Sequence, residues 1–279
     1  MTLDAAREHL ATALGGADRQ VVAPIAVSGD RERVVLVSDF HAPFTRLDVF
    51  ARLCRERADR LVIMGDVDDG YAGSTYTKYE RVPYTKSLAY AKALLERTAE
   101  AFPKVDIIEG NHDLRLEKRL REQLDADIVD AIKVLARGSL SPLKAITENL
   151  PNVTLVGTKV EQFDVRWFYQ LCDLLVCHAD KYSSVPGRTL TVLHKWFSSM
   201  RRQLGLKPFR VLAQAHTHQL TWVPLEADQL GLEVGCCCDV QEYMLAPACT
   251  GVPQRHGYVT LDMVKDKVEI ESIRLHWLD

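Results

Sequence analysis

The chain has 279 residues, enough for one large α/β domain, and its 47% hydrophobic and 26% charged residues are ordinary for a soluble globular protein. A net charge of −3 argues against a strongly basic nucleic-acid-binding protein, although it leaves room for a local basic patch. The N-terminus lacks the basic start and apolar stretch of a secretory signal, and no apolar run approaches the roughly 18–20 residues of a membrane span. We therefore expect a cytoplasmic protein with no membrane partner.

The cysteine content agrees with this expectation. Seven cysteines are an odd number, and in a chain this long they fit a reducing cytoplasm better than a disulfide framework. Three of them are consecutive, at 236–238. Adjacent strand residues point to opposite faces, so three in a row cannot readily face one metal ion. We expect these cysteines to be small residues packed in a strand or turn.

The first half of the chain predicts alternating strands and helices. Residues 1–32 read as an N-terminal helical extension, with a short helix ending near Gly15 and Gly16. After it, apolar runs and helical stripes predict strands and helices in turn at 33–38, 47–54, 61–64, 88–102 and 105–109. This βαβαβ order predicts parallel strands covered by helices.

The second half continues with a long helix and then short strands. Leucine and isoleucine residues at helical spacing predict one helix over 115–136, which Gly138 ends. Later apolar runs predict strands at 153–156, 165–169, 174–177, 211–213, 257–261 and 268–273, and a helix at about 190–204.

Polar side chains follow the ends of five predicted strands. Asp39 and His41 follow the strand at 33–38, Asp66 follows 61–64, and Asn111, His112 and Asp113 follow 105–109. Two later strands end at His178 and at the pair His216 and His218. The loops beyond the carboxyl ends of parallel strands form the binding crevice of open α/β sheets. Carboxylate, imidazole and amide groups gathered there suit Mn, Fe, Zn or Ni.

The order of these segments carries a family resemblance. DxH at 39–41, GDxxD at 65–69, GNHD at 110–113, a lone histidine at 178 and HTH at 216–218 resemble the calcineurin-like metallophosphoesterase superfamily over residues 39–218. The resemblance implies an α/β fold, a four-layer α-β-β-α sandwich with two mixed β-sheets and a helical insertion after GNHD. It also implies a catalytic domain at 33–279, with insertions at about 70–84 and 114–150.

The same resemblance implies roles for the matching residues. The first metal would be bound by Asp39, His41 and His218, the second by Asn111, His178 and His216, with Asp66 bridging both. His112 would be the catalytic histidine, and Asp113 would hold its imidazole in orientation. The cofactors would be two divalent metal ions, with Mn first and Fe, Zn or Ni as alternatives. A hydroxide that bridges such a pair can attack a phosphate ester.

Several positions near the motifs are less typical. Ala215 precedes HTH where relatives carry glycine, and Ala179 follows the lone histidine, and both leave the expected ligands intact. Asp69, the last residue of GDxxD, is expected to support the loop, and Asp68 to be solvated. The remaining histidines are read as structural, and His194 as packed on its helix face.

Two arginines that are typical of one branch of this superfamily are absent next to the motifs. Phosphoprotein phosphatases of this superfamily carry arginine after GDxxD and before GN, where this chain has Gly70 and Glu109. We therefore expect a phosphodiesterase that acts on nucleic acid or a nucleotide. A phosphomonoesterase for a small metabolite or phosphoprotein is one alternative, and a metal-binding assembly protein without significant hydrolysis is another. The sequence leaves the oligomeric state open.

The two insertions offer possible substrate contacts. The insertion at 70–84 combines four tyrosines with Lys78 and Arg81. These side chains either stack bases and neutralise phosphates or pack on the surface, and the sequence leaves both interpretations open. In the helix after GNHD, acidic residues balance much of the basic charge. We therefore expect most of its basic side chains to lie on a solvated face. Arg115, directly after the motif, is the expected substrate contact.

Overall fold

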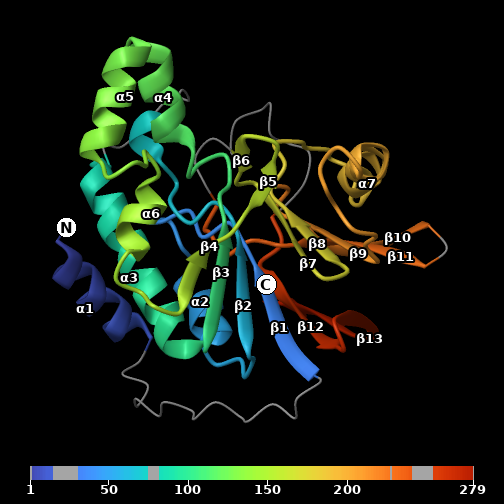
Figure 1. The fold of residues 1–279 in the computed structure, drawn as a ribbon. Helices are drawn as coiled ribbons and strands as arrows, with labels where there is room; N and C mark the ends of the chain where they lie inside the picture. Colours follow the sequence, from blue (N-terminus) through green and yellow to red (C-terminus); the bar gives the residue numbers. More distant parts are fainter. Residues whose placement is uncertain (1, 15–30, 75–81, 227, 241–253, 279) are drawn as a thin grey trace.

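The computed structural model describes residues 2–14, 31–74, 82–226, 228–240 and 254–278. Two β-sheets lie face to face in it, with helices on the outer side of each (Figure 1). Three clusters of buried apolar side chains hold these layers together, one between the sheets and one beneath each outer layer. The expected four-layer α-β-β-α sandwich with two mixed sheets is therefore confirmed.

The first sheet has six strands in the order β13-β12-β1-β2-β3-β4. Its parallel strands are β1 (Arg31–Val37), β2 (Arg60–Met64), β3 (Lys104–Ile108) and β4 (Val153–Leu155). The antiparallel pair β12 (Gly257–Val264) and β13 (Lys267–Trp277) extends its other edge. Because both faces of the central strands are covered, they read as continuous apolar runs rather than as alternating ones.

Alternation along β1 divides its side chains between two cores. Val35 and Val37 pack in the cluster shared with the outer helices, and Val34 and Leu36 pack in the cluster shared with the second sheet. The outer layer consists of α1 (Leu3–Ala13), α2 (Leu47–Leu53), α3 (Tyr84–Ala101) and α6 (Pro142–Thr147) (Figure 1).

The second sheet has five strands in the order β10-β11-β9-β8-β7. They are β7 (Phe168–Leu171), β8 (Leu174–Cys177), β9 (Val211–Gln214), β10 (Leu220–Glu226) and β11 (Gln229–Val234). The outer face of this sheet is covered by α7 (Arg188–Met200), which buries Leu190, Leu193 and Phe197 against it. A separate hairpin pairs β5 (Thr158–Val160) with β6 (Phe163–Val165).

The helical insertion after GNHD differs from its prediction. The single helix expected over 115–136 is two helices, α4 (Arg115–Gln123) and α5 (Ala126–Leu135), which project from the sandwich (Figure 1). Leu124 and Asp125 both have extended backbones, with ψ angles of 150° and 148°. Helix α4 therefore ends before these two residues, and α5 begins after them. The strand expected at 165–169 is also divided, between the end of β6 and the start of β7.

The N-terminal helix is part of the outer layer rather than separate from it. Ala6 and Leu10 of α1 are buried in the same cluster as α3, and Arg7 binds Glu96 with an Nη2–Oε1 distance of 2.6 Å. The expected helix end at Gly15 and Gly16 lies outside the described residues, and the domain boundary at 32 stays a prediction. No helix in the described ranges is long and apolar enough to cross a membrane.

Candidate metal centre

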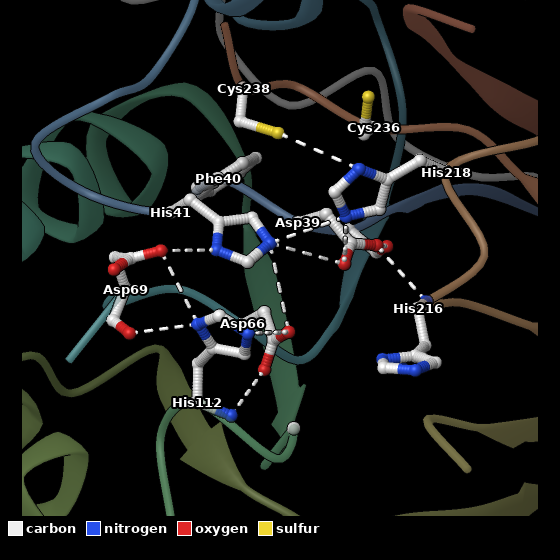
Figure 2. Close-up of polar contacts among 12 residues, drawn as sticks. Asp39, Phe40, His41, Asp66, Asp69, His112, His216, His218, Cys236 and Cys238 are labelled. Carbon is white, nitrogen blue, oxygen red and sulfur yellow. Dashed lines mark hydrogen bonds and ion pairs between the residues drawn. The ribbon is translucent and has the colours of Figure 1, made fainter. Parts of the chain in front are cut away.

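Five loops converge at one edge of the two sheets. The loops after β1, β2 and β3 carry Asp39 and His41, then Asp66, then Asn111 and His112, and those after β8 and β9 carry His178 and then His216 and His218. Figure 2 shows several of these side chains pointing toward one another. The structure thus brings all seven predicted metal ligands to one place, although they come from segments up to 179 residues apart in sequence.

The backbone at these positions is unusual. Ten non-glycine residues in the described ranges have a positive φ angle, and five of them are predicted ligands: Asp39, His41, Asp66, His216 and His218. Such angles are sparsely populated by side-chain-bearing residues and cluster at functional sites. At these turns the chain leaves its strand abruptly, which lets residues two apart, such as Asp39 and His41, face the same centre.

Two motif glycines allow the loops to meet. A Cβ atom added at Gly65, which has a φ angle of +89°, would lie 2.6 Å from the backbone nitrogen of Gly110. A Cβ atom added at Gly110 would overlap the carboxylate of Asp66. Only glycine therefore permits this close approach of the GD and GN loops.

The first predicted metal site gathers one carboxylate and two imidazoles. Asp39 Oδ1 lies 3.1 Å from His218 Nε2 and 3.5 Å from His41 Nε2, and the two Nε2 atoms are 3.3 Å apart (Figure 2). All three side chains are buried. A carboxylate and two imidazoles aimed at one point are a donor set suited to a divalent transition metal.

The second predicted site lies on the other side of Asp66. His178 Nε2 is 3.1 Å from Asn111 Oδ1, and the rings of His178 and His216 are 5.4 Å apart between centroids. Ligand atoms of Asp66, His178 and His216 lie within 4.8 Å of one another. This set of carboxylate, amide and imidazole groups likewise suits a transition metal.

Asp66 lies between the two sets. Its buried Oδ2 atom is 3.2 Å from His178 Nε2 and 3.7 Å from His41 Nε2, and it accepts no hydrogen bond from the part of the chain that the structure describes. Its Oδ1 atom accepts a hydrogen bond from the backbone N–H of His112 at 2.9 Å. A buried carboxylate oxygen without a partner is costly. Its position between two nitrogen-rich clusters fits a pair of cations there.

Burial and neighbouring charges shift the pKa values of the side chains in this cluster. Burial opposes ionisation of Asp66, but the neighbouring imidazoles of His178 and His112 lower its pKa. Burial also opposes the charge on His178, yet Asp66 raises the pKa of that histidine to about 9. Burial and the charge of His178 lower the pKa of His216 to about 4. Metal ligation requires neutral imidazoles, so cations would take the place of these protons.

In His178 and His41, a hydrogen-bond partner of Nδ1 on the side away from the centre determines that Nε2 faces the centre. His178 donates from Nδ1 to the backbone carbonyl of Met64 at 2.6 Å, which leaves Nε2 toward Asp66. His41 Nδ1 lies 2.9 Å from Asp69 Oδ2, which leaves its Nε2 toward Asp39. Such contacts behind metal-binding histidines fix the tautomer and the ring orientation. Asp69 thus supports the site, as the sequence suggested.

His112 is held by a different residue from the one expected. Its Nδ1 atom donates to the backbone carbonyl of Asp69 at 2.8 Å and lies 3.3 Å from Asp69 Oδ2. On the opposite side of the ring, Nε2 accepts from Arg115 Nη2 at 3.0 Å. A donor on one side and an acceptor on the other define the neutral tautomer with the proton on Nδ1. Its Nε2 atom also lies 3.9 Å from Asp66 Oδ2, beside the predicted metals.

The prediction that Asp113 orients His112 was therefore wrong. The buried Asp113 carboxylate accepts backbone N–H groups instead, from Asp66 at 2.7 Å, Asp68 at 3.0 Å and Gly110 at 2.9 Å. It ties the second and third loops together. The sequence places Asp113 next to His112, but the chain turns between them, and proximity along the chain does not determine side-chain direction.

The expectation that Asp68 is solvated was also wrong. Asp68 is buried, and its carboxylate accepts a hydrogen bond from the Ser87 hydroxyl of α3. Burial raises the pKa of Asp68 to about 6. This contact joins the Asp66 loop to the outer helical layer, and it depends on α3 crossing behind the loop, which the local sequence does not show.

We predict that Asp113→Asn destabilises the fold through the two loops. Asparagine keeps one acceptor oxygen, so at least one buried N–H loses its partner, at a cost of about 1–3 kcal/mol. Urea unfolding of the metal-free protein measures the loss. Asp69→Asn is the matched comparison, because Asp69 contacts His41 and His112 and we expect that change to lower turnover more than stability. Equal stability of wild type and Asp113→Asn would contradict the role assigned to Asp113.

A cleft opens beside the centre and runs between α4 and α7. It has a volume of about 870 Å³, and its lining includes Asn111 and His178. Arg115, the expected substrate contact, also lines it. The tryptophans Trp167 and Trp196 form part of its wall. No motif marks them, because they meet only when α7 covers the second sheet.

The three consecutive cysteines and His194 are packed as the sequence predicted. Cys236, Cys237 and Cys238 are buried, as expected of packed small residues, and the Cys238 sulfur lies 4.0 Å from His218 Nδ1 (Figure 2). His194 is buried and bonds to Gln229 Oε1 at 2.6 Å, which confirms its packing role. Gln254 Nε2, 2.8 Å from His218 Nδ1, is a site neighbour that no sequence signal marked.

The tyrosine-rich insertion is described only in part, because residues 75–81 lie outside the described residues. Tyr71 packs edge-on against Phe44, with ring centroids 5.4 Å apart. Tyr84 begins α3 and hydrogen-bonds Asp68, and burial raises its pKa. These two tyrosines pack within the protein, so they support the packing interpretation at the two ends of the insertion.

The family follows from comparison with known proteins. A family model described as calcineurin-like phosphoesterase matches residues 32–233, most of the chain. The chain belongs to this family, in agreement with the five motifs and the four-layer fold. It is a metal-dependent phosphoesterase, a hydrolase that acts on phosphate esters. No curated protein matches the chain.

Solved structures with a similar fold are distant in sequence. A metallophosphoesterase from Sphaerobacter thermophilus is 14% identical over 89% of this chain and 88% of that chain, with a TM-score of 0.44. Vps29 from Chaetomium thermophilum is 10% identical over 88% and 97%, with a TM-score of 0.42. A protein serine/threonine phosphatase from Saccharomyces cerevisiae is 10% identical over 99% and 89%, with a TM-score of 0.41. Likenesses this distant carry no argument about the substrate.

Proposed function

We propose that this protein is a dinuclear metal-dependent phosphodiesterase whose substrates are nucleotides or nucleic acid. The observation that carries the dinuclear part is the position of the buried Oδ2 atom of Asp66, between His41 of one predicted site and His178 of the other. In this proposal Asp39, His41 and His218 hold one cation, Asn111, His178 and His216 hold the other, and Asp66 is shared.

In this proposal, different groups of the site have different roles in hydrolysis. A bound pair of divalent cations would polarise the phosphoryl group and activate the attacking water. His112 faces the same centre, and as an imidazolium that has taken up a proton from solvent at Nε2 it would pass that proton to the leaving oxygen. Since Arg115 donates to Nε2 in this structure, the arginine must shift toward the substrate before the imidazole can act. Asp69 holds the ring throughout, through its carbonyl and its carboxylate.

The residue before the GN motif favours a diester over a monoester. A phosphomonoester carries more negative charge than a diester and needs additional cations to grip it. Glu109 stands where the protein phosphatases carry arginine, and Arg166 neutralises it, with an Nε–Oε2 distance of 2.9 Å. The Ser141 hydroxyl also donates to the Glu109 carboxylate. This position therefore offers no free cation, while the adjacent cleft has room for a second ester group.

The test compares two aryl esters on the Mn²⁺-loaded protein. We expect bis(p-nitrophenyl) phosphate to give a higher kcat/KM than p-nitrophenyl phosphate. The reverse order would support the phosphomonoesterase alternative. Two bound metals without hydrolysis of either ester would support the assembly protein.

Metal removal gives a further prediction. We expect a chelator to abolish activity and Mn²⁺ to restore it, with Fe, Zn or Ni tested in parallel because the ligand set accepts them all. Mn²⁺ at about 100 times its Kd should stabilise the fold by about 2.7 kcal/mol per site, because the ion binds the folded chain. Urea unfolding with and without Mn²⁺ measures this. Activity that survives complete demetallation would contradict the proposal.

A further inference from the structure

The cleft between α4 and α7 has two unlike walls. On the α7 side, the rings of Trp167 and Trp196 lie 5.8 Å apart between centroids, at 38° to each other. Trp167 is fixed from behind by Phe168 and Phe197, at 4.8 Å and 5.8 Å. This wall is therefore a rigid aromatic surface rather than a loop tip.

The outer part of the aromatic wall remains exposed. Trp196 is 39% exposed, and Val192, about one turn earlier on α7, is 53% exposed. The buried side of the same helix carries Leu190, Leu193 and Phe197, so its apolar surface extends well beyond what the second sheet covers. Exposed apolar surface that lines a cleft marks a ligand-binding surface more often than scattered apolar residues do.

The α4 wall is basic. Arg115, Lys118 and Arg119 are spaced three and four residues apart, so they share one face of α4. Among the described residues, four basic and two acidic side chains line the cleft, although the chain has a net charge of −3. The cleft is thus a local positive region on an acidic protein, and it reaches the predicted metal ligands Asn111 and His178.

These walls together fit one kind of ligand. A flat apolar ring can lie on Trp196, and phosphate oxygens can face α4 and the predicted metals. A nucleotide is an ester of phosphate that carries such a flat ring. Bases in a duplex are stacked and paired, so an indole reaches only an unpaired base. Stacking on tryptophan tolerates all bases, because each has a π-face.

We propose that this cleft is a nucleobase site, in which Trp196 stacks on the unpaired base next to the phosphodiester that is cleaved. The inference rests on the proposed phosphodiesterase function and assigns the substrate class as nucleotide diesters or single-stranded nucleic acid, with little base preference. Trp196 is a specificity residue in this scheme. Its indole contacts the organic group of the substrate and takes no part in bond cleavage.

The kinetic test uses two diesters with the same leaving group. Thymidine 5′-(p-nitrophenyl phosphate) carries a base, and methyl p-nitrophenyl phosphate does not, so any contact with the nitrophenyl group cancels in their ratio. Trp196→Leu keeps apolar bulk against Trp167 but removes the flat ring. We expect it to raise KM for the thymidine ester about 5- to 150-fold, with kcat unchanged and little effect on the methyl ester. Trp196→Phe should restore most of the affinity.

Trp222→Leu is the matched control. Trp222 lies on β10, is 57% exposed and does not line the cleft. An equal effect of Trp196→Leu on both esters, or the same KM increase in Trp222→Leu, would overturn the nucleobase site. Hydrolysis of p-nitrophenyl phosphate alone would instead refute the diesterase proposal.

A binding measurement tests the base site independently of turnover. Adenosine 5′-monophosphate and ribose 5-phosphate differ only in the base. We expect the first to quench the tryptophan fluorescence of the Mn²⁺-loaded wild type at lower concentration than the second, and Trp196→Leu to remove that difference. Equal apparent affinities of the two compounds for the wild type would overturn the inference, whatever the outcome of the esterase assays.

Discussion

The Asp66→Asn variant is expected to lose bound metal at both sites and to lose nearly all activity. Asp66 Oδ2 lies between His178 Nε2 and His41 Nε2, at 3.2 Å and 3.7 Å. An amide of the same shape removes the negative charge and turns either a donor or a single neutral oxygen toward the cations. Because bound cations supply several kcal/mol of transition-state stabilisation, we expect kcat/KM to fall about a thousandfold.

Metal analysis of the purified Mn²⁺-loaded variant, together with diester hydrolysis, measures both effects. Asp164→Asn is the matched control, because Asp164 is an exposed aspartate of β6 and is not one of the predicted ligands. Two full equivalents of metal in Asp66→Asn would contradict the bridging role, even if activity fell. Loss of one equivalent alone would assign Asp66 to a single site.

The His112→Asn variant is expected to keep both metals and to lose most turnover. Its asparagine amide can still donate toward the Asp69 carbonyl, so the GN loop has a replacement for the contact made by Nδ1. It cannot carry a proton to the leaving oxygen. Loss of a general acid lowers kcat about 100- to 10,000-fold, and we expect a decrease in this range with little change in metal content.

His194→Asn serves as the comparison for His112→Asn. His194 is buried, whereas His112 is half-buried, and it bonds to Gln229 beneath α7, outside the metal centre. We expect that variant to lower stability and to leave kcat unchanged. If His112→Asn lost metal instead of turnover, His112 would be a ligand rather than an acid, and the division between metal-binding and catalytic residues would have to be redrawn.

The fold was predictable to the extent that local patterns specify it. Continuous apolar runs at β1, β2 and β3 and helical stripes between them predicted parallel strands under helices, and the structure has them. The break between α4 and α5 was missed because Leu124 fits the apolar spacing of both helices, and spacing alone does not show that its backbone is extended. The division between β6 and β7 was missed for the same reason.

By itself, the sequence determined the family and the chemical types of the site residues. Motif order and strand-end position specify which donors are available, because a strand end delivers its next side chains to a known edge of the sheet. Only the tertiary structure decided which residue each donor contacts. Asp69 rather than Asp113 holds His112, Asp68 is buried against α3, and Trp196 faces α4 across the cleft. Each of these contacts joins elements that meet only after the layers pack, so no local pattern encodes it.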